Sequence, residues 1–364
     1  MTEQSGGFGR TRRNFLAGAG AVGLAAVAGC SGNGGGDGTT TSESGGPEPP
    51  QELNAGGSST VYPILDEAQK YWNGNPEAGG EYWKPGDYGI DTDQRLADYW
   101  VSQYGFEGTG SGDPLYGVSV KLSHSDVGLK NLMEGKLDIG DASAPVKAEL
   151  SDLDEATYEK FTNHVVGIDA MQMIVSKAVR DAGVTRLTKE QVAAIYTGEI
   201  TDWSQIDAYD GPDKEIQCVG RVQGSGTRTI FHLNILGSAG AKAGGVDTHQ
   251  SENQQVESAV ANSDNAVGYV GLAFTDNEAA PTVELEVDGT VYSRANGNLQ
   301  TGDYPLNRDL HCYTWEGTSR AEASFLAMVL SDYGQATFVE PNDYLPLPDD
   351  RQRAQLQQLE SLQD

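Results

Sequence analysis

The sequence predicts an α/β protein with two lobes, and two observations lead to this fold class. Short apolar strands alternate with helical segments from residue 53 to about residue 345, which is typical of a mainly parallel sheet in each lobe. Roughly three hundred residues follow the N-terminal leader and linker, enough for two α/β lobes that each bury a core. No internal repeat is visible.

The first thirty residues have the features of an export signal. Arg12 and Arg13 precede an uncharged run of small and apolar residues at 15–29, which is too short to span a bilayer as a stable helix. Twin arginines are typical of the Tat pathway. The small residues before Cys30 resemble a lipobox, so we expect a lipid on Cys30 and anchoring to the outer face of the cell membrane. An uncleaved membrane anchor with an idle Cys30 is the alternative.

Residues 31–52 contain Gly, Ser, Thr, Pro and acidic residues with almost no apolar side chain, which predicts a flexible tether. The whole chain carries 53 Asp and Glu against 24 Lys and Arg, a formal charge of −29. This charge argues against nucleic acid and anionic lipid surfaces as partners. The acidic residues are spread along the chain, as in proteins kept soluble in concentrated salt, so a halophilic protein is expected.

The predicted elements of the first lobe start with a strand at 53–57 that enters a glycine turn and leads to a helix ending near residue 72. Alternation predicts a strand at 117–122, and a helix and a short buried strand follow it. Two apolar segments, 165–168 and 171–175, are expected to carry the chain into the second lobe.

The second lobe is expected to begin with a helix that ends at Tyr196. Thr188 followed by Gln191 forms a capping-box pattern at its start, and Gly198 stops it. Further elements of this lobe are expected at 216–220, 229–236 and 256–261, and the chain then returns to the first lobe with elements at 266–271, 313–315 and 321–333.

We therefore expect lobe I to comprise 53–168 and 266–350, lobe II to comprise 169–265, and 351–364 to form a C-terminal tail. Residues 73–113, with one helical segment, interrupt the α/β alternation and are interpreted as an insertion. Its aromatic side chains are expected to pack a small subdomain, although a partner surface or a shield over a cleft is the alternative. These residues, with Trp72 before them, are Trp72, Tyr82, Trp83, Tyr88, Tyr99, Trp100 and Tyr104.

Cysteine and histidine supply no sign of a metal or cofactor. Cys218 and Cys312 both lie in segments that resemble buried strands, so two free core thiols are favoured over one disulfide. The five histidines are scattered, and no CxxC or HExxH pattern occurs. We expect no metal site and no cofactor.

Three strand-to-helix junctions carry small hydroxyl residues or glycine: residues 58–60, 123–128 and 224–227. In open α/β sheets ligands bind outside the carboxyl ends of strands, where free backbone N–H groups at helix N-termini favour anions. Arg221 could add one charge-assisted fork. The similar loop at 108–112 follows no strand and is interpreted as a flexible connection.

Several segments resemble the phosphate-binding proteins of high-affinity phosphate ABC importers. The similarity covers about residues 53–72 and 117–345, and with the leader it suggests a haloarchaeal-type Tat lipoprotein. Its motifs are Gly57–Ile64, Gly128–Lys130, Leu137–Ser143, Leu187–Trp203, Arg221–Arg228 and Val267–Val270.

The resemblance implies a periplasmic-binding-protein type II fold, in which two hinge strands join two α/β lobes around a ligand cleft. It implies a non-catalytic solute-binding protein that captures phosphate and delivers it to ABC permease subunits. The residues expected to contact the ligand are Ser59, Thr60, Val61, Ser125, Asp141, Ser143, Arg221, Ser225, Gly226 and Thr227.

The chain departs from the family at the second loop. Some members have an aspartate there that accepts the proton of hydrogen phosphate, and others an arginine, whereas this chain has Ser143 and Ala144. Asp141 or Asp126 could supply the acceptor, or could be a cap or surface carboxylate. A carboxylate that accepts the proton of hydrogen phosphate would repel the unprotonated oxygens of sulfate. Phosphate is therefore favoured over sulfate, molybdate or tungstate as the ligand.

Two other functions compete with transport. An exported phosphate-ester hydrolase would need a nucleophile beside a base, but Ser225 lies in no Gly-x-Ser-x-Gly elbow and has no histidine near it in sequence. A sensory or adhesive lipoprotein that lost its ligand is the third possibility. The prediction is that the chain is not an enzyme.

Overall fold

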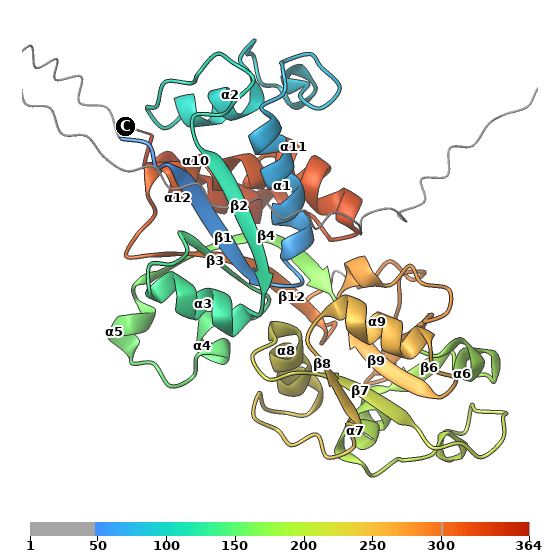
Figure 1. Ribbon diagram of the computed structural model, residues 1–364. Helices are drawn as coiled ribbons and strands as arrows, with labels where there is room; N and C mark the ends of the chain where they lie inside the picture. Colours follow the sequence, from blue (N-terminus) through green and yellow to red (C-terminus); the bar gives the residue numbers. More distant parts are fainter. Residues whose placement is uncertain (1–47, 300, 364) are drawn as a thin grey trace, which may run out of the picture. The chain divides into compact units, whose positions relative to one another are not determined.

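The computed structural model describes residues 48–299 and 301–363 (Figure 1). The predicted export signal, Cys30 and most of the predicted tether lie outside these residues. Within the described residues, no helix has the length and apolar character needed to cross a membrane.

The first sheet has five strands in the order β2-β1-β3-β12-β4. Strands β1, β2 and β3 run parallel, whereas β12 is antiparallel to both β3 and β4. This sheet and its helices are called the first lobe below. Its strands are β1 (Glu52–Ser58), β2 (Gly117–Ser123), β3 (Ile139–Ala142), β4 (Phe161–Ala170) and β12 (Asn307–Trp315).

Helices of the first lobe pack against this sheet, α1 on β2 and α3 on β3 and β1. A Cβ on Gly128 of α3 would lie 2.6 Å from the carbonyl oxygen of Gly56, so only glycine allows this close approach to β1. The helices and single turns are α1 (Tyr62–Gly74), α3 (Ser125–Met133), α4 (Val146–Glu149), α5 (Glu155–Tyr158), α10 (Arg320–Leu330), α11 (Asp332–Gly334), the π-turn Gln335–Val339 and the 3-10 turn Glu340–Asn342.

The second sheet has seven strands, in the order β11-β10-β5-β9-β7-β8 with β6 paired to β10. Parallel and antiparallel pairs are both present in this sheet and in the first, so the expectation of a mainly parallel sheet in each lobe was wrong. Its strands are β5 (Gln172–Val175), β6 (Arg186–Thr188), β7 (Gln217–Arg221), β8 (Thr248–Gln250), β9 (Ala266–Val270), β10 (Thr282–Val287) and β11 (Thr290–Tyr292).

The helices of this second lobe are α6 (Lys177–Asp181), α7 (Lys189–Thr197), α8 (Gly226–Ile235), α9 (Asn253–Ala261) and the 3-10 turns Trp203–Gln205 and Leu272–Phe274. The predicted capping box of α7 is confirmed: the Gln191 amide donates to Thr188 Oγ1 over 3.1 Å, and the Thr188 amide donates to Gln191 Oε1 over 2.9 Å. Gly198 ends this helix with φ 88°.

The boundary expected at residue 266 between the lobes is corrected by the strand pairing. Strand β9 lies between β5 and β7, so residues 266–292 belong to the second lobe. The chain enters this lobe between β4 and β5 and returns through the segment 293–306 to β12. An apolar strand sequence such as Ala266–Val270 carries no information about which of two sheets it joins.

The insertion at 73–113 forms the turn Pro85–Tyr88 and the helix α2 (Leu96–Ser102). Trp83, Trp100 and Tyr104 are buried, while Tyr82 is exposed. The Trp83 ring lies 4.9 Å from the Tyr333 ring, edge to face, so the insertion packs on the C-terminal part of the first lobe.

The C-terminal segment is a helix, α12 (Asp349–Glu360), and not the expected tail. Leu359 is buried, and Gln352 Nε2 donates to the carbonyl oxygen of Leu330 at the end of α10. A mostly polar helix sequence with two anchoring side chains gives little apolar periodicity to detect.

Both cysteines of the described residues are buried free thiols, as predicted. Cys218 lies on β7 and Cys312 on β12, in different sheets.

Candidate anion site

The first loop of the candidate site joins β1 to α1. Ser59, Thr60 and Val61 are buried at the N-terminus of this helix, and the Thr60 amide donates to Ser58 Oγ over 3.1 Å. Pro63 lies in the first turn, where the missing N–H costs nothing. The hydroxyl groups of Ser59 and Thr60 therefore lie at the positive end of a helix of thirteen residues.

The second loop region combines the start of α3 with the end of β3. The Ser143 amide donates to Ser125 Oγ over 3.2 Å, and both serines are 1% exposed. No described residue forms a hydrogen bond with the Ser143 hydroxyl, although it is buried. Ser143 thus offers an uncommitted hydroxyl beside a second helix N-terminus.

The third loop joins β7 to α8 and ends in the N-cap Ser225. Its Oγ accepts from the Arg228 amide over 3.4 Å, as an N-cap should. Gly224 has φ 88°, a left-handed conformation that glycine adopts without strain. Gly226 and Thr227 form the first turn of α8.

These three loops, from the two lobes, meet at one place. Thr60 Oγ1 lies 3.2 Å from Thr227 Oγ1. A Cβ on Gly226 would lie 2.5 Å from Ser143 Oγ and 2.6 Å from Ser125 Oγ. The structure therefore brings most of the residues predicted from the three motifs into direct contact across the interface between the lobes.

Arg221 supplies the predicted guanidinium and is 2% exposed. Its Nη2 donates to Ser59 Oγ over 3.1 Å and to the Ser251 carbonyl over 2.7 Å, and its Nη1 donates to Asn253 Oδ1 over 2.9 Å. Burial lowers the pKa of Arg221 to about 10, so the group keeps its charge at neutral pH.

The carboxyl groups of Asp141 and Asp126, the predicted acceptors, lie beside Gly57 and Gly224 of the first and third loops, and their role as acceptors stays a prediction. The Asp141 carboxyl is buried on β3 without a hydrogen-bond partner among the described residues, and burial raises its pKa well above the usual range. Asp126 pairs with Lys130 over 2.8 Å in the first turns of α3. Val61 contributes its buried backbone to the start of α1, and its carbonyl accepts from the Ile64 amide.

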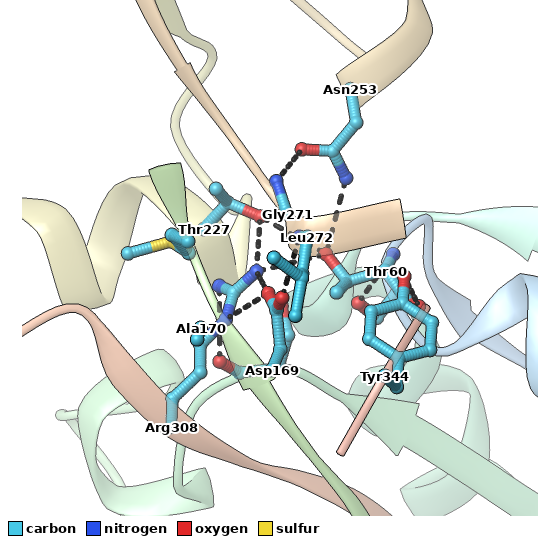
Figure 2. A network of polar contacts seen from close by, with 12 residues as sticks. Thr60, Asp169, Ala170, Thr227, Asn253, Gly271, Leu272, Arg308 and Tyr344 are labelled. Carbon is cyan, nitrogen blue, oxygen red and sulfur yellow. Dashed lines mark hydrogen bonds and ion pairs between the residues drawn. The ribbon is translucent and has the colours of Figure 1, made fainter. Parts of the chain in front are cut away.

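Figure 2 shows residues that the motifs did not reveal: Asp169, Asn253, Arg308 and Tyr344. Asn253 Nδ2 donates to Thr60 Oγ1 over 3.1 Å, and Tyr344 donates to the Thr60 carbonyl over 2.6 Å. Asp169 and Arg308 are ionisable residues within otherwise buried strands. A charge in such a strand requires a partner, and that was the signal available in the sequence.

Some hydroxyl groups of the cluster have no acceptor for their proton among the described residues, Ser143 Oγ among them. Ser59 Oγ accepts from Arg221 and Asn253, and no contact among the described residues takes up its own proton. Thr60 Oγ1 accepts from Asn253 and Arg308. The charged groups joined by these hydrogen bonds are two guanidinium groups and the carboxylate of Asp169, so the bonded groups together carry a positive charge. Such an arrangement suits a small, acceptor-rich anion with several oxygens.

Comparison with known proteins agrees with this geometry. Residues 92–333 match the family model of the PBP superfamily domain. The chain is 30% identical over 232 residues to the phosphate-binding protein PstS of Bacillus subtilis, which covers 64% of this chain and 72% of that protein. It is 24% identical over 319 residues to PstS of Staphylococcus aureus, covering 86% of this chain and 84% of that protein.

Solved structures share the fold. A Clostridium perfringens substrate-binding protein assigned to a phosphate ABC transporter, solved with bound phosphate, superposes with a TM-score of 0.58 at 22% identity, over 82% of this chain and all of that one. An ABC-type phosphate transport receptor from Vibrio cholerae gives a TM-score of 0.55 at 20% identity, over 81% of this chain and all of that one. The chain therefore belongs to the PBP superfamily and, within it, to the PstS-like phosphate-binding proteins, with the type II periplasmic-binding-protein fold.

Proposed function

We propose that this chain captures inorganic phosphate outside the cytoplasm and delivers it to the permease of an ABC importer, without catalysing a reaction. One observation carries the proposal: buried hydroxyl groups and guanidinium groups from both lobes converge on the contact between Thr60 and Thr227. The names of the curated relatives and the ligand of the Clostridium perfringens protein point to the same anion.

Phosphate suits the site because its oxygens can each accept hydrogen bonds from the hydroxyl groups, backbone amides and guanidinium groups. The ligand contacts we propose are the residues of the three loops together with Arg221. Ser143 Oγ is the group proposed to accept the proton of hydrogen phosphate, because a hydroxyl can both donate and accept. Sulfate carries no such proton, so a hydroxyl in place of a carboxylate separates the two anions less sharply.

Release and delivery would follow from opening of the lobes. The loops meet only where the lobes touch, and the chain passes between the lobes through just two connections in the described part. Binding of the anion would hold the lobes together, and a permease could recognise that closed form. The Tat leader and the lipid on Cys30 are part of the proposal: the leader would direct export, and the lipid would hold the protein at the outer face of the cell membrane.

The decisive experiment is calorimetric titration of the purified chain with phosphate, arsenate, sulfate, molybdate and tungstate at low and high salt. We expect one phosphate per chain with a Kd of about 1 μM or tighter, and a rise in Tm on binding. Preferential binding of sulfate or molybdate would replace phosphate as the ligand. If no oxyanion binds or raises Tm, the transport function is wrong.

Anchoring is tested separately in cells. A Cys30→Ser chain should be found in the medium or soluble fraction, whereas the unmodified chain should sediment with membranes. Equal membrane association of both chains would contradict the lipid anchor and would leave the phosphate proposal unaffected.

A further inference from the structure

We propose that Arg308 is a second cation that contacts the bound anion, and that Asp169 is the positioning residue that aims it. The inference rests on the proposed function, since it concerns the same site. The loop motifs single out one arginine, Arg221, whereas the structure places a second guanidinium in the same cluster (Figure 2).

Strand pairing places the two residues opposite each other. Arg308 is the second residue of β12, and its partner in the antiparallel register with β4 is Asp169. Arg308 Nε lies 3.0 Å and Nη2 lies 2.7 Å from Asp169 Oδ2. The side chains are 2% and 0% exposed, so the pair is buried and its geometry is held by the sheet.

Asp169 is itself fixed by a backbone donor of the second lobe. Its Oδ1 accepts from the Leu272 amide over 2.7 Å, just after β9 of the second lobe. Both carboxylate oxygens are therefore engaged, one by Arg308 and the other by a backbone donor. The carboxylate serves as a rigid support for the guanidinium and is already committed to protein donors.

The Nη2 atom that bonds Asp169 also contacts both lobes, while Nη1 donates to the Ser143 carbonyl over 3.3 Å. Arg308 Nη2 lies 3.1 Å from Thr60 Oγ1 of the first lobe and 3.1 Å from Thr227 Oγ1 of the second. Nη2 has two hydrogens, but three acceptors surround it when Asp169 is counted. An anion oxygen arriving between the threonines can replace one hydroxyl as acceptor, without breaking the pair with Asp169.

The energetics favour a ligand role over a purely structural one. A buried ion pair is a poor source of stability, because desolvation of two charges offsets most of their attraction. This pair also places Arg308 Nη2 at the contact between two lobes, against Thr60 and Thr227. A phosphate dianion at this contact would face both Arg221 and Arg308. Two guanidinium groups beside one carboxylate would stabilise the dianion better than one arginine paired with one carboxylate.

The test measures phosphate affinity and Tm for Arg308→Gln, Arg308→Lys, Asp169→Asn and the double variant Arg308→Gln/Asp169→Asn. We expect Arg308→Gln to weaken phosphate binding at least about 30-fold, which is the lower end for truncating a buried charge partner. Arg308→Lys should recover part of the affinity, since it keeps the charge but loses the fork. Asp169→Asn should weaken binding about tenfold, because the Arg308 guanidinium would lose the carboxylate that orients it.

The double variant separates ligand contact from folding. It removes both buried charges, so its Tm should exceed that of Arg308→Gln, in which Asp169 is left unpaired. If Arg308 contacts the anion, the double variant stays weak in phosphate binding despite its recovered Tm. Recovery of affinity together with Tm would overturn the proposal.

Arg351→Gln is the matched control, because Arg351 forms an exposed ion pair with Asp309, the neighbour of Arg308 on β12, over 2.8 Å. Its phosphate affinity should equal that of the unmodified chain. If the unmodified chain binds no phosphate, the proposed function fails. If it binds phosphate and the Arg308 variants bind equally well, only the role of Arg308 fails.

Discussion

Two loops of this protein are rich in glycine and hydroxyl residues, yet they differ in the partners of their backbone N–H groups. In the insertion, residues 108–112 wrap around Asp98, whose carboxylate oxygens accept from the Thr109 amide over 3.1 Å and the Gly110 amide over 3.0 Å. Asp98 is 4% exposed. This loop does cradle an anion, but the anion is a side chain of the protein itself.

The loop at 224–227 has the opposite arrangement. No contact among the described residues takes up the backbone N–H groups of Gly226 and Thr227 at the start of α8. Arg221, at the end of β7, supplies a positive charge near this loop, and the Asp126 carboxylate beside Gly224 pairs with Lys130. The comparison teaches that composition alone predicts which loops could hold an anion, whereas the contacts of the backbone N–H groups decide whether these groups remain available to a ligand.

The largest expected effect comes from Arg221→Ala. It removes a buried cation from the 224–227 region, and we expect phosphate affinity to fall by about 100-fold or more in calorimetry. Arg95→Ala, which removes the partner of Glu77 beside the 108–112 loop, is the control and should leave the affinity unchanged. Equal losses of phosphate affinity in the two variants would contradict the inference that only the 224–227 loop takes part in phosphate binding.

Gly226→Ala should have the next largest effect on binding. Its Cβ would fall 2.5 Å from Ser143 Oγ across the lobe interface, so we expect closure to be impeded and affinity to drop about tenfold. The first turn of a helix accepts alanine well, so stability within the lobe should not suffer. Gly112→Ala has open space around its Cβ and should change nothing. Unchanged binding by Gly226→Ala would mean that the loops separate in the ligand-bound form.

Asp98→Asn should alter stability and leave binding unaffected. Replacing the carboxylate weakens two charge-assisted hydrogen bonds to the 108–112 loop, and we expect a loss of about 1–2 kcal/mol in urea unfolding. The phosphate Kd should stay the same. A weaker Kd would show that the loop in the insertion takes part in the site.

The smallest effect is a pH dependence from Glu149 of α4, a carboxyl that lies near α8. Burial raises its pKa to about 8, an effect that Thr229, Arg308 and Arg228 oppose and that Asp126 reinforces. A folded-state pKa above the ordinary value means that stability is lost as pH rises from about 4.5 toward 8. Glu149→Gln should therefore have a higher Tm than the unmodified chain near pH 8 and a similar Tm near pH 4.

The control for this pH effect is Glu155→Gln, an exposed residue that pairs with Lys147. Its Tm should follow that of the unmodified chain at each pH. Parallel Tm curves for Glu149→Gln and the unmodified chain would rule out Glu149 as the source of the dependence.

Local signals in the sequence predicted the features that depend on neighbouring residues. Thr188 and Gln191 predicted the start of α7, because a capping box closes within one turn. The three anion loops were found for the same reason, since each places glycine or hydroxyl residues where a strand meets a helix. The boundary at residue 266 and the C-terminal helix were missed, because pairing and docking depend on distant parts of the chain.

The sequence by itself determined where strands end in glycine and hydroxyl residues at helix N-termini, since turn chemistry is a property of a few consecutive residues. Only the tertiary structure decided which loops face one another, and which charges join them. Asp169 and Arg308 lie 139 positions apart and meet because β4 and β12 pair in one register. The fold brings the Asp98 carboxylate to the amides of the 108–112 loop, whereas no contact in the described part takes up the amides of Gly226 and Thr227.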